Sequence, residues 1–224
     1  MNRTSFYLLF AVLLLAGCQT SPRFSVSGTI SHADGETLYL EHTQLTTTTI
    51  LDSCVLDGEG EFKLHAPSPE HPDFYRLRIG KRSLPLSVDS IEEIIVVSTR
   101  DSLPYTLSIQ GSEASLIMAQ LRATARTATR EELRKQAQEV IVSNPRSLAA
   151  YYAVFLKQGG EYIWNILDPA DRRMYQAVAT SFQTWMPNYE RTKVLCNQVK
   201  DVLQAERNIK NQQAMRDFID KAEN

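Results

Sequence analysis

The chain has 224 residues and a formal net charge of −2, with 43% hydrophobic and 22% charged residues. This composition is typical of a folded protein, and the residues after position 17 suffice for one large domain or two smaller ones. Because the chain has no basic excess, nucleic acid is not an expected partner.

The first residues have the features of a lipoprotein signal peptide. Arg3 precedes an apolar run of about ten residues at 6–15, which fits a signal-peptide core and is too short to span a membrane. The stretch Leu15-Ala16-Gly17-Cys18 resembles a bacterial lipobox. That resemblance implies cleavage before Cys18 and lipidation of its thiol, so residues 1–17 are predicted to be the signal peptide and 18–23 a tether.

Lipid on Cys18 predicts a membrane partner and a place in the cell envelope, with palmitate among the acyl chains. Two or three acyl chains anchor a protein firmly, whereas one holds it weakly. Residue 19 is Gln rather than Asp. By resemblance to known sorting signals, this favours an outer-membrane lipoprotein that faces the periplasm. The alternative is a plain secretory signal that contains a cysteine.

Residues 24–111 alternate between apolar and polar positions with turn residues between short runs, which predicts an antiparallel β-sandwich of about eight strands. Asp57-Gly58 predicts a tight hairpin turn. The run 93–97 is apolar on both faces, which predicts a central strand covered on both sides. Strands are expected at 24–30, 37–41, 50–56, 61–65, 73–79, 83–88, 93–97 and 105–109.

From residue 112 the apolar residues recur at helical spacing, which predicts an α-helical bundle over 112–224. Ser112 or Ser115 is expected to cap the first helix. Asn144-Pro145 and Asp168-Pro169 each predict a cap followed by proline at the first helical position, and the former is expected to begin a helix over 146–158. The fold class is therefore α+β, a β-sandwich domain followed by a helical domain.

Several of these residues together resemble a known family. The resemblance includes Asn144-Pro145-x-Ser147-x-Ala149-Ala150-Tyr151 in the helical part. In the β-rich part the matching residues are Phe24-x-x-x-Gly28-x-Ile30, Leu38-Tyr39-Leu40, Leu51-Asp52-Ser53, Asp57-Gly58-x-Gly60-x-Phe62, Pro72-x-Phe74-Tyr75-x-Leu77 and Gly111-Ser112.

The family resembled is a β-rich domain of unknown function in lipoproteins of Bacteroidota. It usually precedes a membrane-tethered thioredoxin-like domain of the AhpC/TSA type. This chain has no Cys-x-x-Cys pair and no further βαβ pattern, so the resemblance implies a fold and no oxidoreductase activity.

No catalytic constellation, cofactor site or metal site is predicted. The triplet Asp52-Ser53-Cys54 lies inside an apolar strand, and the carboxylates of 57–61 are explained by a hairpin. Cys54 and Cys196 are expected to be two buried reduced thiols, with a disulfide or a reactive thiol as alternatives. The histidines are too dispersed for a metal site; they are His32, His42, His65 and His71.

Aromatic residues are concentrated in the helical part, where core packing explains most of them. The alternative is a groove between sandwich and bundle that receives a peptide or a small ligand. The last helix is expected to extend and to offer Met215, Phe218 and Ile219 to a partner. The aromatic residues are Tyr151, Tyr152, Phe155, Tyr162, Trp164, Tyr175, Phe182, Trp185 and Tyr189.

These observations favour a non-catalytic, periplasm-facing membrane lipoprotein that acts as a binding or scaffolding module for a periplasmic protein or peptide. The alternative is an accessory factor to a separate periplasmic thioredoxin-like thiol–disulfide system. A third hypothesis is a hydrolase whose site forms only in three dimensions.

Overall fold

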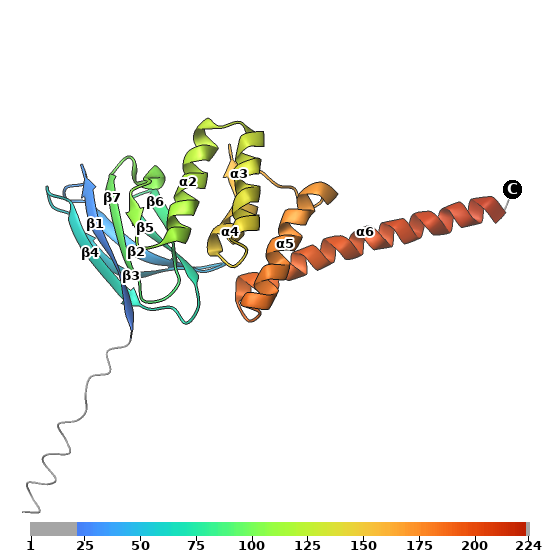
Figure 1. Ribbon diagram of the computed structural model, residues 1–224, viewed down its shortest axis with the longest axis horizontal. Helices are drawn as coiled ribbons and strands as arrows, with labels where there is room; N and C mark the ends of the chain where they lie inside the picture. The colour runs from blue at the N-terminus through green and yellow to red at the C-terminus, as the bar shows by residue number, and fades with distance from the viewer. Residues whose placement is uncertain (1–21, 223–224) are drawn as a thin grey trace, which may run out of the picture.

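The computed structural model describes residues 22–222, so Cys18 and the predicted signal peptide lie outside the described residues. A β-rich part is followed by a helical part, which confirms the α+β fold class (Figure 1). The strands of the β-rich part are β1 (Arg23–Ser31), β2 (Thr37–Thr43), β3 (Thr48–Val55), β4 (Glu61–Pro67), β5 (Asp73–Ile79), β6 (Arg82–Val88), β7 (Glu93–Thr99) and β8 (Ile109–Gln110).

These strands form two four-stranded sheets with the orders β4-β1-β7-β8 and β3-β2-β5-β6. The alternation of apolar residues explains the sandwich, because every second side chain of a strand points to the same face. Val26 and Leu64 of the first sheet and Leu40 and Leu77 of the second are fully or almost fully buried in one shared core. The hairpin at Asp57 is present, and its carboxylate accepts the backbone N–H of Gly60 at 2.9 Å.

Three details of the sandwich differ from the sequence-based expectation. The pairing of β1 with β7 is parallel. β7 lies inside its sheet, but its outer face is open, with Ile95 42% and Val97 50% exposed, so the expectation of cover on both sides is wrong. The segment expected as a strand at 105–109 instead contributes to the 3₁₀-helix η2 (Leu103–Tyr105) and to the two-residue β8, because Pro104 favours a helical first turn.

Two glycines are required by the close approach of backbone to β7. Gly28 has a φ of +142° and Gly111 has a φ of +84°. Residues other than glycine rarely adopt these backbone conformations. A Cβ atom added to Gly28 would lie 1.9 Å from the carbonyl oxygen of Val96. A Cβ atom added to Gly111 would lie 1.9 Å from the carbonyl oxygen of Glu93. These contacts give a physical reason for the glycines in the β-rich pattern.

The helical part begins where Ser112 caps α2 through a hydrogen bond from the backbone N–H of Ser115, as one of the two expected caps. Asp168 caps α5 with Pro169 at its first position, as expected. The helices are α2 (Glu113–Thr127), α3 (Arg130–Ser143), α4 (Leu148–Val154), α5 (Pro169–Trp185) and α6 (Glu190–Ala222).

The helix expected over 146–158 is shorter than predicted. Ser147, not Asn144, caps α4, and the helix ends at Val154. The chain then forms a small hairpin of β9 (Lys157–Gln158) and β10 (Glu161–Tyr162). Gly159 and Gly160 both have positive φ angles and form its turn, so they do more than end a helix.

The helical part packs against the edge of the sandwich at β6. The backbone N–H of Ser87 in β6 donates to Ser115 Oγ at 2.8 Å, and Ser112 Oγ donates to the carbonyl of Ser87 at 2.8 Å. All three serines are buried. These bonds satisfy polar groups that would otherwise be buried without partners, and they fix the start of α2 on the sheet.

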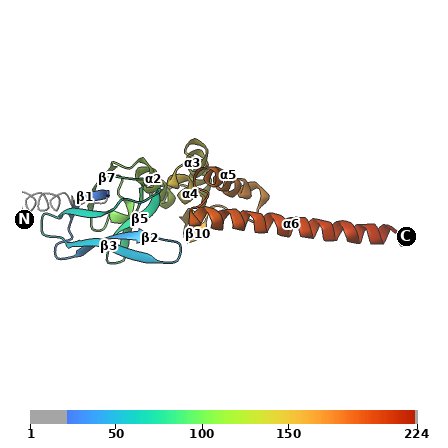
Figure 2. The ribbon, with the colours of Figure 1, turned by 90° about the horizontal axis from the view of Figure 1, so that it is seen from below.

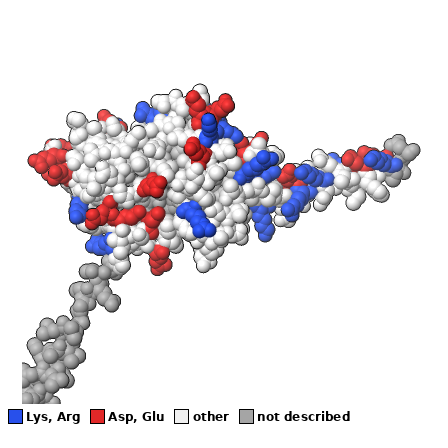
Figure 3. Space-filling view, viewed as in Figure 1, with Lys and Arg blue, Asp and Glu red and all other residues white. Residues whose placement is uncertain are grey.

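The last helix changes character along its length. Leu195 and Val199 are buried against the helical core, and Glu206 pairs with the buried Arg172 at 2.6 Å. From Arg207 to Lys221 every residue is exposed, and this half of α6 projects from the body in both ribbon views (Figures 1 and 2). Charged residues of both signs lie along it, while much of the visible face of the body is uncharged (Figure 3). Within residues 22–222, no helix combines the length and apolar composition that a bilayer crossing requires.

Candidate functional site

A cavity of about 470 Å³ lies between the sandwich and the helices; we call it the interdomain cavity. The sandwich contributes the end of β2, the first half of β5 and part of β6, while α4, the β9–β10 hairpin and α6 form the other wall. Its lining is Thr43, Leu45, Phe74, Tyr75, Arg76, Ser83, Pro85, Tyr151, Tyr152, Phe155, Lys157, Tyr162, Arg191, Val194 and Gln198.

Aromatic rings form much of this lining. The ring of Phe74 from β5 lies 6.0 Å from that of Tyr151 on α4, which in turn lies 5.0 Å from Phe155. Phe155 also makes an edge contact with Tyr162 of the hairpin at 6.3 Å. Such packed rings offer a rigid apolar surface of the kind found in ligand pockets.

The charged residues of the interdomain cavity are all cationic. Arg191 lies over the ring of Phe74 at 5.0 Å and donates to the carbonyl of Thr43 at 2.5 Å. The ammonium of Lys157 lies 4.4 Å from the centre of the Tyr162 ring. Arg76 differs, because it pairs with Glu41 at 2.5 Å and its charge is compensated there. The cavity therefore combines an apolar wall with a positive potential.

A buried hydroxyl in the lining has no partner. Thr43 Oγ1 is buried and makes no hydrogen bond with the described residues. An unsatisfied buried polar atom costs free energy, so it needs a specific reason in a native protein.

Next to this cavity, a buried polar cluster joins the two parts of the chain. Asp73 at the start of β5 accepts hydrogen bonds from His42 Nε2 at 2.7 Å and from the Tyr189 hydroxyl at 2.6 Å. The backbone N–H of Phe74 donates to the same carboxylate at 2.8 Å. Burial by itself raises the pKa of Asp73, but these hydrogen bonds outweigh it and hold the pKa below its ordinary value.

The His42–Asp73 pair resembles two members of a catalytic triad, and through Tyr189 the same carboxylate also joins the sandwich to the segment before α6. His42 also stacks on the ring of Tyr75, with the ring centres 4.9 Å apart. The cavity of about 400 Å³ beside His42 and Asp73 has no serine, threonine or cysteine among the described residues that line it. Tyr75 and Tyr189 are the hydroxyl-bearing residues of this lining, and the Tyr189 hydroxyl is engaged with Asp73.

The four histidines fall into two groups. His42 and His71 line the same cavity, and the ring of His71 contacts that of Tyr189 at 4.9 Å. His65 lies in β4, where its backbone N–H donates to Asp52 Oδ2 at 2.8 Å, and His32 lies in the turn after β1. In the described part of the chain, no group of three metal-binding side chains is present.

Cys54 and Cys196, the two cysteines among the described residues, are both free thiols. The predicted alternative of a disulfide between them is therefore wrong for the described structure. Burial raises the pKa of both thiols, and the nearby carboxylate of Asp52 raises that of Cys54 further. Both side chains are half-buried rather than fully buried. A raised pKa disfavours the reactive thiolate.

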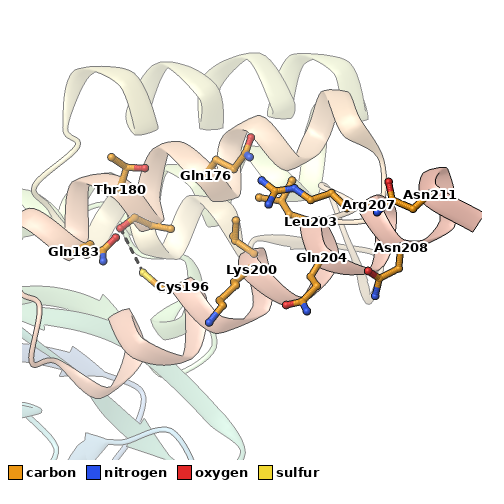
Figure 4. A pocket seen from close by; sticks show the side chains of 12 residues that line it. Gln176, Thr180, Gln183, Cys196, Lys200, Leu203, Gln204, Arg207, Asn208 and Asn211 are labelled. Atoms are coloured by element: carbon orange, nitrogen blue, oxygen red, sulfur yellow. Dashed lines mark hydrogen bonds between the residues drawn. The ribbon is translucent and has the colours of Figure 1, made fainter.

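Cys196 belongs to a groove of about 670 Å³ between α5 and α6, and its Sγ lies 3.7 Å from the carbonyl oxygen of Ala179 (Figure 4). Apolar residues such as Val199 and Leu203 line part of this groove, and amide and cationic side chains line the rest. The labelled polar residues are Gln176, Thr180, Gln183, Lys200, Gln204, Arg207, Asn208 and Asn211. Among the described residues that line this groove there is no aromatic ring, in contrast to the interdomain cavity.

The structure separates the predicted aromatic residues into different roles. Tyr151, Tyr152, Phe155 and Tyr162 line the interdomain cavity, which lies where the sequence predicts a groove. The others pack in the helical core or, for Tyr189, in the polar cluster; in the core these are Trp164, Tyr175, Phe182 and Trp185. The sequence analysis placed the groove between sandwich and bundle but did not name the sandwich residues that line it, and the pattern Phe74-Tyr75-Arg76 was the signal that could have found them.

Comparison with known proteins identifies the β-rich part only. Residues 24–115 match the family described as "Domain of unknown function (DUF4369)". No curated protein matches the chain. A solved structure of a 9R-lipoxygenase from Cyanothece PCC8801 matches with 10% sequence identity and a TM-score of 0.24. The match covers 64% of this chain and 29% of that one, and a likeness so weak carries no conclusion about fold or function.

Proposed function

We propose that this chain is a non-catalytic membrane lipoprotein that faces the periplasm, and that it acts as a binding module through the interdomain cavity. The observation that carries the binding role is a cavity with aromatic walls and cationic side chains, with no acidic residue among the described residues that line it. Pockets with rigid apolar walls and a few polar groups are where proteins bind small ligands and peptides.

The membrane role rests on the lipobox-like stretch that ends at Cys18. Radiolabelled palmitate should enter the wild-type chain in cells and should not enter the Cys18→Ser variant. Equal labelling of both would remove the anchor from the proposal. Fractionation of outer and inner membranes then tests the proposed location.

The ligand is sought by photo-crosslinking from the rim of the cavity. Tyr162 is 47% exposed there, so a photoreactive phenylalanine at this position can reach a ligand without disturbing the core. The matched control carries the same group at Ile91, which is 65% exposed on the sandwich. Mass spectrometry should identify adducts from position 162 that position 91 does not give. Identical adducts from both positions, or none, would contradict binding at the cavity.

The thiol–disulfide alternative receives no support from the two cysteines, whose pKa values are both raised. Trapping of a mixed disulfide through Cys54 or Cys196 would reverse this judgement. A Cys54→Ser, Cys196→Ser double variant that loses the trapped partner serves as the control.

A further inference from the structure

A second, smaller cavity of about 380 Å³ adjoins the interdomain cavity; we call it the side cavity. The two share Tyr152, Phe155 and Lys157 in their linings. The side cavity extends from these residues to α2, which contributes Arg122 and Arg126. A ligand long enough to pass Phe155 would therefore contact both cavities at once.

The side cavity concentrates positive charge in a chain whose formal net charge is −2. Arg122, Arg126 and Lys157 line it, and no Asp or Glu is among the described residues lining either cavity. None of the salt bridges within residues 22–222 involves these three cations or Arg191. Within the described residues, no carboxylate therefore forms an ion pair with any of these four cations.

Neutral groups hold these cations in place. The guanidinium of Arg126 lies 4.1 Å from the centre of the Tyr105 ring, and Arg122 Nε donates to the carbonyl of Pro104 at 3.1 Å. Rings and carbonyls orient a cation without neutralising it, which leaves its charge for an incoming anion. Arginine also presents paired donors that match a carboxylate or a phosphate.

Two consecutive tyrosines of α4 connect the cavities. Burial raises the pKa of both hydroxyls, while Arg191 counteracts the rise at Tyr151 and Arg122 counteracts it at Tyr152. Each tyrosine is therefore close to a different arginine, one in each cavity. This arrangement provides a hydrogen-bonding group beside each positive charge.

We propose that the side cavity is an anion-binding subsite, and that the ligand of this protein has an apolar or aromatic group joined to a carboxylate or a phosphate. The inference rests on the proposed binding function of the interdomain cavity. The apolar group lies against Phe74 and Tyr151, and the anionic group lies among Arg122, Arg126 and Lys157. Mutual repulsion among the three cations decreases when the anion binds.

Three probes with the same apolar group test this proposal on the full chain purified in detergent. Phenylbutyrate carries a carboxylate, phenylpropyl phosphate carries a phosphate, and phenylbutyramide is neutral. Titrations followed by NMR should give a Kd roughly tenfold lower for at least one acid than for the amide at low salt. The preference should shrink as salt screens the charges.

A pair of variants separates charge from structure. Arg126 is exposed, so Arg126→Gln should leave the fold intact. The variant should raise the Kd of the preferred acid about tenfold and leave the Kd of the amide unchanged. Arg146→Gln removes an exposed cation that lines neither cavity and should behave as the wild type. Equal affinities for all three probes, no binding of any probe, or equal effects of Arg126→Gln on acid and amide would overturn the inference. The crosslinking from position 162 needs no anionic group, so it tests the proposed function separately.

Discussion

Two neighbouring regions at the junction of sandwich and helices differ in how their charged side chains are partnered. In the polar cluster, the carboxylate of Asp73 is surrounded by three donors, from His42, Tyr189 and the backbone of Phe74. In the two cavities, Lys157, Arg122 and Arg126 face rings and carbonyls instead of carboxylates. The satisfied charge fastens the two parts together, whereas the unsatisfied charges are available to a ligand.

The largest effect on stability is expected at the satisfied carboxylate. Asp73→Ala removes the acceptor of three buried or half-buried donors, and breaking such a group costs about 3 kcal/mol. Urea denaturation should show this loss in the free energy of unfolding. Arg126→Gln, its counterpart in the side cavity, should change the same quantity by less than about 0.5 kcal/mol. Similar losses in both variants would end the distinction between the two regions.

Acid should weaken the polar cluster. The folded pKa of Asp73 is lowered by its hydrogen bonds, so the stability that it contributes is present above the unfolded pKa of about 4 and is lost as pH falls through the folded pKa. The free energy of unfolding should therefore decrease below about pH 4. An Asp73→Asn variant should show a smaller decrease over the same range; an identical decrease would show that Asp73 makes no contribution to it.

Glu92, which forms no salt bridge within residues 22–222, gives the opposite pH dependence. Burial raises the pKa of Glu92 to about 6, and the nearby charge of Asp89 adds to the rise although the Asp89 N–H donates to Glu92. A raised pKa means that stability is lost as pH rises from the unfolded pKa near 4.5 through about 6. Glu92→Gln should therefore stabilise the protein by about 1 kcal/mol at pH 8 and have little effect at pH 4. Glu93→Gln, at an exposed neighbour, is the control and should be neutral at both pH values.

The smallest effect on stability is expected at the projecting half of α6. Phe218 is 70% exposed and Met215 is 61% exposed, so Phe218→Ser should change the free energy of unfolding by less than about 0.5 kcal/mol. The sequence predicts that these side chains meet a partner. In cells, crosslinking from α6 should then recover a protein that the Phe218→Ser variant does not recover. Unchanged recovery would contradict the predicted contact.

Local sequence rules identified most elements of this chain. Alternation gave the strands of the sandwich, Asp57-Gly58 gave a hairpin, and Asp168-Pro169 gave the start of α5. The same rules failed where competing local signals were close together. Pro104 favoured a 3₁₀ turn over a strand at 105–109, and Ser147 replaced Asn144 as the cap of α4.

The sequence by itself determined most of the residues that face a core, because the period of apolar residues follows directly from strand and helix geometry. It did not determine which faces meet. Asp73 and Tyr189 are separated by 116 positions, and no local pattern indicates that their side chains bond. The cavities arise in the same way, since Phe74 of β5 and Tyr151 of α4 become neighbours only when the sandwich edge packs against the helices. Tertiary packing therefore decided which charges are compensated and which are left for a ligand.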